Sequence, residues 1–212
     1  MNKKIIVILF LLFSISTMAD SYRGHSFDDV VMSHESIIVA EITLAKAHMF
    51  ESSEKANICG YSYKASKIKS LKGGRGALLE FSSIKPLELT KKYLLFVSSK
   101  NPNRVIAASS AGKDMPDPKK DCLLSLPEKY VTSSPTRSFQ FSSKLIDRKE
   151  WIIDKQGDAV FPSSVLERRV VVKGGDDTSI FFGEIFRLIA WEELEREIEA
   201  VLVKNKQSAV SN

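Results

Sequence analysis

Five short stretches, most of them alternating between apolar and polar residues, constrain the fold of this chain more than any other feature. Glycine, proline, lysine and serine separate them, and glycine, proline and serine favour turns. The stretches span residues 36–48, 61–68, 77–83 and 93–98, with a weaker one over 103–112. Strands of this length and spacing predict a small antiparallel barrel or sandwich.

Alternation also predicts which side chains share a face, because successive side chains in a strand point to opposite sides. In the first stretch one face is expected to carry Ile38, Ala40, Ile42 and Leu44. A short helix is expected just before it, over Phe27 to Ser33, with Ser26 as the N-cap and two acids in the first turn.

The tail has a different period. From Ile180 onward, apolar residues recur at intervals of three and four, and the second half, "WEELEREIEA", is strongly charged. This pattern predicts a C-terminal amphipathic helix over residues 178–204, either packed on the barrel or reserved for a partner or a membrane surface. The expected organisation is therefore a barrel domain over 20–131, a linker with short β segments over 132–177, and this helix.

The N-terminus has the three parts of a secretory signal peptide. Lys3 and Lys4 precede an unbroken apolar run, and Thr17-Met18-Ala19 is a small-x-small cleavage site. Residues 1–19 are therefore expected to be removed, which places the mature protein in the periplasm or the medium. The alternative, an uncleaved anchor, is disfavoured because the apolar run is shorter than the ~20 residues that span a bilayer.

The cysteine count fits an exported protein. Cys59 and Cys122 are the two cysteines of the chain, and an even number in this context predicts one disulfide bond. Two free thiols or a metal pair are the alternatives, and the pair has no nearby histidine to complete a zinc site.

Charge and aromatic residues offer one weak binding surface. The formal net charge is +5, and about +3 once Lys3 and Lys4 are removed, which does not favour nucleic acid as a partner. In "YSYKASKIKSLKGG", aromatic and basic residues interleave, and the candidate binding residues are Tyr61, Tyr63, Lys64 and Lys67. A tyrosine on a strand can equally cover the core. The following "LKGGRG" lacks the spacing of a phosphate-binding loop and is better explained as a turn.

These elements resemble the netrin-like, tissue-inhibitor-of-metalloproteinase type of domain. The resemblance covers about residues 26–125 and depends on the short helix, on "SIIVAEI", on a strand ending in Lys72-Gly73, and on "YLLF" at Tyr93 to Phe96. It implies a five-stranded oligonucleotide/oligosaccharide-binding barrel. Two departures matter: Thr90 stands where the family usually has glycine, and the mature chain begins at Asp20 rather than at a zinc-chelating cysteine. The family's metal-chelating inhibition is therefore not expected here.

No motif for catalysis or cofactor binding is apparent. The histidines, His25, His34 and His48, match no metal-ligand spacing, and no serine lies in a G-x-S-x-G motif. We therefore expect a non-catalytic exported module without a cofactor or a metal, which binds an envelope protein or an extracellular polymer. The alternatives are a secreted hydrolase and an assembly factor that docks through its C-terminal helix.

Overall fold

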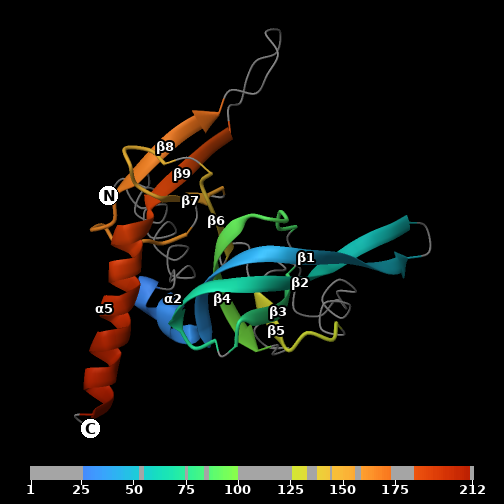
Figure 1. Cartoon of the computed structure of the whole chain (residues 1–212), viewed down its shortest axis with the longest axis horizontal. Helices are drawn as coiled ribbons and strands as arrows, with labels where there is room; N and C mark the ends of the chain where they lie inside the picture. Colours follow the sequence, from blue (N-terminus) through green and yellow to red (C-terminus); the bar gives the residue numbers. More distant parts are fainter. Residues whose placement is uncertain are drawn as a thin grey trace, which may run out of the picture.

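The computed structural model describes residues 26–52, 55–74, 76–83, 86–99, 126–132, 138–143, 145–155, 159–172 and 184–210. In this part the chain is mainly β, with nine strands and two helices, α2 (Phe27–Ser33) and α5 (Trp191–Val210). Figure 1 shows a strand-rich body with α5 running along one side.

The predicted N-terminal helix is confirmed. α2 begins after Ser26, whose hydroxyl accepts a hydrogen bond from Asp29 N at 3.1 Å, while the Asp29 carboxylate accepts one from Ser26 N. This reciprocal capping box satisfies backbone donors that a helix start leaves unpaired. The helix ends at His34, which is extended, and α2 buries Phe27, Val30 and Val31.

Five strands close into a barrel, as the sequence predicted. They are β1 (Ser36–Ser52), β2 (Lys55–Lys72), β3 (Leu78–Ser83), β4 (Lys92–Ser99) and β5 (Tyr130–Thr132). The order is β1-β2-β3-β5-β4, and an additional β1–β4 pairing closes it. Only β3 and β5 run parallel. The expected strand over 103–112 lies outside the described residues, and β5 supplies the fifth strand instead.

Alternation along β1 fills two cores at once. Ile38, Ala40 and Ile42 face the barrel interior, where they meet side chains of β2, β3 and β4. Ile37 and Val39 face outward and pack against α2 and α5. The predicted inner face ends earlier than expected, because a register shift between Ile42 and Leu44 turns Leu44 to solvent.

β1 and β2 run on beyond the barrel. β4 pairs with β1 only as far as Glu41, and β3 pairs with β2 only from Tyr61. Residues 48–52 and 55–60, which we call the ribbon, therefore pair only with each other within the described chain. The ribbon is the long two-stranded projection on the right of Figure 1.

The segment after the barrel is the one predicted as a linker with short β segments. It contains β6 (Ser138–Phe141), β7 (Trp151–Asp154) and β8 (Glu167–Val172), and β6 pairs directly with β4. The sheet thus continues from the barrel in the order β4-β6-β7-β9-β8. The flanking serines, threonines and proline suggested a linker, but the alternation in "SFQF" buries Phe139 and Phe141.

The C-terminal helix is confirmed, but its predicted start is wrong. Residues Glu184–Ala190 form strand β9, which pairs with both β7 and β8, and the helix begins only at Trp191 and ends at Val210. β9 buries Ile189 on one face and Leu188 and Ala190 on the other, and a mainly apolar segment of this kind cannot be distinguished from a buried helix by periodicity. The predicted cap at Thr178 lies outside the described residues.

The helix packs on the body. Its apolar stripe joins α2, the outer face of β1 and β4, and residues of β6, β7 and β9 in one hydrophobic cluster. The stripe consists of Trp191, Leu194, Ile198 and Val201. The helix was predicted either to pack on the barrel or to be reserved for a partner or a membrane surface. The structure shows the first alternative, because the stripe covers the barrel.

Candidate functional site

The predicted binding residues lie on opposite sides of β2. Tyr63 is 1% exposed and points into the barrel, where its hydroxyl accepts a hydrogen bond from Leu87 N at 2.7 Å. Burial raises the pKa of Tyr63 to about 12. Its ring stacks on Phe81 at 5.3 Å, and half-buried Tyr61 stacks on Tyr63 at 6.0 Å. Tyr63 therefore covers the core, which is the alternative that the sequence left open for a tyrosine on this strand.

The two predicted lysines are engaged within the chain. Lys64 is exposed on the outer face and forms an ion pair with Glu80 of β3 at 2.7 Å, which raises the pKa of the lysine. Lys67 donates a hydrogen bond to the carbonyl of Gly74 at 2.7 Å. The four residues thus do not form one stacking platform, although Lys64 remains accessible.

The Lys72-Gly73 element joins β2 to helix α2. Lys72 Nζ donates hydrogen bonds to the carbonyls of Val31 and Met32, at 3.0 and 2.8 Å, at the C-terminal end of α2. These carbonyls have no partner within the helix and carry negative partial charge, so a cation is favourable there. Burial lowers the pKa of Lys72. This lysine thus caps a helix rather than holding a phosphate.

Gly73 and Gly74 bring the backbone close to the start of β1. Both have positive φ, 58° and 72°, a conformation that glycine adopts readily. A Cβ on Gly73 would lie 2.3 Å from the carbonyl oxygen of Glu35 and 2.8 Å from Ser36 Oγ. Only glycine therefore fits at position 73 without movement of the backbone.

A cleft of about 640 Å³ opens beside these glycines, and we call it the end cleft. It lies between the start of β1, the β2–β3 connection and the segment before β5, at the opposite end of the barrel from the ribbon. Its polar lining consists mainly of Glu35, Ser36, Glu80, Glu128 and Lys129, with Tyr130 beside them. Leu78, Leu79 and Pro127 supply apolar walls.

Two of the carboxylates in the end cleft are held in place. Glu35 accepts hydrogen bonds from the backbone and the hydroxyl of Ser99, at 3.1 and 2.7 Å. Glu128 accepts one from Ser82 Oγ at 2.8 Å. Ser36 is 8% exposed, and no described residue forms a hydrogen bond with its hydroxyl. The sequence pointed to none of these residues, because the cleft assembles from segments far apart in the chain.

The base of the ribbon carries a serine–histidine contact. His48 Nε2 lies 2.6 Å from Ser62 Oγ on the neighbouring strand. No carboxylate contacts this histidine in the described part of the chain, so the pair is a dyad rather than a catalytic triad.

Cys59 lies beside this contact and is buried. The described part of the chain contains no free cysteine, and the predicted partner, Cys122, lies outside it. The disulfide therefore stays a prediction.

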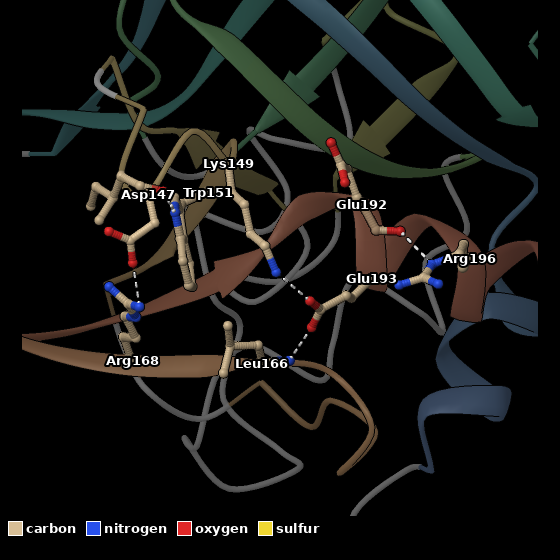
Figure 2. Close-up of polar contacts among 9 residues, drawn as sticks. Asp147, Lys149, Trp151, Leu166, Arg168, Glu192, Glu193 and Arg196 are labelled. Carbon is tan, nitrogen blue, oxygen red and sulfur yellow. Dashed lines mark hydrogen bonds and ion pairs between the residues drawn. The ribbon is translucent and has the colours of Figure 1, made fainter.

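Charged residues anchor the start of α5 to the residues just before β7 and β8 (Figure 2). The Glu193 carboxylate accepts hydrogen bonds from Lys149 Nζ at 2.9 Å and from Leu166 N at 2.6 Å. These contacts, led by the one to Lys149, lower the pKa of Glu193. Nearby, Arg168 pairs with Asp147. This cluster is explained by its role in fixing the helix, and we assign no ligand to it.

The described ranges contain neither a candidate metal site nor a candidate membrane-spanning helix. No group of three or more histidine, cysteine or acidic residues is placed to hold a metal ion there. None of the described helices has the length and apolar character to cross a membrane. Comparison with protein-family models, with curated proteins and with solved structures finds no match to this chain.

Proposed function

We propose that this chain is an exported, non-catalytic binding module of the bacterial envelope, which docks a protein partner through the ribbon. The N-terminal pattern of Lys3, Lys4 and the apolar run supports export to the periplasm or the medium. The barrel supports a rigid scaffold that needs no cofactor to present a binding surface.

The observation that carries the proposal is the ribbon itself. Two strands without further neighbours are marginally stable alone in water, and they expose unpaired backbone groups along both edges. Met49 and Ile58 are directly paired across the ribbon, and they are 58% and 45% exposed. Strand edges that pair with no other described residue, beside an apolar pair, are suited to a partner that adds an extended segment to the sheet.

The resemblance to netrin-like domains supports the proposal of a non-catalytic binding module. The five-stranded closure agrees with the barrel that the netrin-like domains imply. Thr90, which replaces the usual glycine of that family, has a φ of 60°, in the left-handed region that glycine favours. Membership of that family is part of our proposal.

The experiment is a pull-down from periplasmic extract with ribbon variants and a matched control. Met49→Lys and Ile58→Lys place charge on the ribbon, whereas Ile68→Lys changes an equally exposed apolar residue of β2 outside it. We expect one protein to be captured by the wild type and by Ile68→Lys, and lost with either ribbon variant. Equal capture by all four proteins would contradict docking through the ribbon.

The contact between His48 and Ser62 favours one alternative, a secreted hydrolase. A histidine within hydrogen-bond reach can take the proton of a serine that attacks a carbonyl. A fluorophosphonate probe distinguishes the two functions. Our proposal expects no label on Ser62, whereas labelling that disappears in Ser62→Ala would establish the hydrolase in its place.

A further inference from the structure

We propose that a short stretch of β1 at the base of the ribbon takes up an extended segment of a partner protein that has the pattern apolar–acid–apolar. The stretch consists of Ala45, Lys46 and Ala47, and we call it the β1 edge. The inference deepens the function proposed above and rests on it, because both depend on a partner strand that joins the sheet.

The hydrogen bonds of β2 show which way the backbone of the β1 edge points. In an antiparallel pair, two directly opposite residues either bond to each other or both turn their backbone groups away. Lys67 N donates to a carbonyl just before β3, so its backbone bonds toward β3. By alternation the same holds for Tyr63 and Tyr61, whose partners on β1 are Ala45 and Ala47. The N–H and C=O groups of both alanines therefore point away from β2.

Within the described chain, no strand occupies that side of the β1 edge. β4 pairs with β1 only as far as Glu41. The last contacts on that side are those of Ile42, whose N–H donates to the carbonyl of Lys91 at 3.1 Å and whose carbonyl accepts from Thr90 N at 2.8 Å. All three side chains of the β1 edge are exposed. An added strand would continue the sheet from the point where β4 leaves it, and unpaired backbone groups are a ready template for such a strand.

The face that carries the two alanines favours apolar side chains in the partner. Ala45 lies opposite Tyr63, and Ala47 lies opposite Tyr61. Tyr61 is half-buried, and its ring stacks on that of Tyr63. Because the alanine methyl groups are short, larger apolar side chains on an added strand would extend over them toward the exposed part of the Tyr61 ring. Contacts between aromatic and branched or aromatic side chains on one face stabilise a sheet.

The opposite face favours an acid. Lys46 points to this face, because side chains alternate along a strand, and its partner on β2 is Ser62. No acid in the described part of the chain forms an ion pair with Lys46, whereas Lys64 on the same face is already paired with Glu80. An acid between the two apolar residues of the partner would lie opposite Lys46, and cross-strand pairs of opposite charge are stabilising.

The test is binding of short peptides to the mature protein, followed by the amide NMR shifts of Ala45 and Ala47. The probe carries Val-Glu-Phe between threonines, and a second peptide carries Val-Lys-Phe. We expect the acidic probe to shift both amides, to slow their hydrogen exchange, and to bind about fivefold more tightly than the basic peptide. N-methylation of the probe's valine removes an N–H that faces β1 and should abolish binding. N-methylation of its glutamate, whose N–H faces away, should leave binding unchanged.

Charge reversal makes the result specific to the β1 edge. Lys46→Glu should reverse the preference, so that Val-Lys-Phe binds more tightly than Val-Glu-Phe, and this gain shows that the variant is folded. Lys206→Glu reverses an exposed lysine on α5 and should leave both affinities unchanged. The proposal is overturned by an absence of binding of the acidic probe, by full binding after N-methylation of the valine, or by an unchanged preference in Lys46→Glu. Slow exchange of both alanine amides without peptide, rising with protein concentration, would identify a second copy as the occupant and would also overturn it.

The pull-down with the ribbon variants separates this inference from the proposed function. Peptide binding at the β1 edge, together with capture that Met49→Lys does not affect, would contradict only docking through the ribbon. Loss of capture in Met49→Lys, together with an absence of peptide binding, would contradict only strand addition at the β1 edge.

Discussion

Gly73→Ala is the substitution that most directly tests how β2 meets the start of β1. At a φ of 58°, a residue with a Cβ carries the left-handed strain of about 1–2 kcal/mol. The new Cβ would also lie 2.3 Å from the carbonyl oxygen of Glu35, which is backbone and cannot rotate away. Relieving such an overlap by shifting the backbone costs about 1–3 kcal/mol.

One effect acts in the opposite direction. Alanine restricts the unfolded chain more than glycine does, which stabilises the folded state by about 0.4–1 kcal/mol. The expected net loss in the free energy of unfolding is therefore about 1–4.6 kcal/mol, out of a total of about 5–15 kcal/mol for a domain. The movement should also weaken the two hydrogen bonds that Lys72, the residue before Gly73, donates to the end of α2.

Urea unfolding of the oxidised mature protein measures this loss, and Gly76→Ala is the matched control. Gly76 also has positive φ, 90°, but its added Cβ would meet nothing closer than 3.9 Å. The control therefore carries the backbone strain without the overlap, and we expect it to lose about 1 kcal/mol. If both variants lost the same free energy, the close approach at Gly73 would not be a source of stability, and the reasoning would fail.

Four further outcomes are expected. Thr90→Gly should raise the free energy of unfolding by about 0.5–1 kcal/mol in urea, because it relieves strain at a φ of 60° but adds freedom to the unfolded chain. Lys72→Met should lower it by about 1–2 kcal/mol, because two helix carbonyls lose their donor. The pKa of Glu193 is held below its usual value of 4.5, chiefly by Lys149. The ionised carboxylate therefore contributes fully to the free energy of unfolding above pH 4.5, and this contribution is lost as the pH falls through the folded pKa. The difference in melting temperature between wild type and Glu193→Gln should therefore shrink as the pH falls below about 4.5 toward the folded pKa. Non-reducing mass spectrometry should find the Cys59 disulfide, and reducing it should cost roughly 4 kcal/mol, since it closes a loop of about 64 residues; two free thiols would reject the pairing.

Local signals made the barrel predictable. The capping residues around α2, the alternation in β1 and β2, and the turn residues between strands each act over a few positions, so the sequence displays them directly. Alternation did not identify β9 as a strand. A strand that is covered on both faces has no solvent-facing side, so polar residues do not alternate with apolar ones along it. Glu184 and Arg187 are isolated charges within β9, whereas the dense charge begins at Glu192, which is where the helical pattern and the helix coincide.

The sites were less predictable than the fold. Period two assigns Tyr61 and Tyr63 to one face of β2, but it does not say which face closes on the core. The end cleft combines Ser36, Gly73, Glu80 and Glu128 from four segments, and only closure of the barrel brings them together. No spacing in a single sequence encodes such a convergence.

The packing of α2 against α5 has a consequence for how the chain can acquire its structure. Val30 and Val31 near the start of the described chain share a hydrophobic cluster with Leu194 and Ile198 near its end, and Asp28 lies 4.0 Å from Lys204. A chain that emerges N-terminus first, from a ribosome or through a translocation channel, cannot bury these valines until α5 has followed. Maturation is then governed by contacts of the longest sequence separation, which form slowly. A chain arrested before Trp191 would leave the apolar surface that α5 covers exposed to chaperones and proteases.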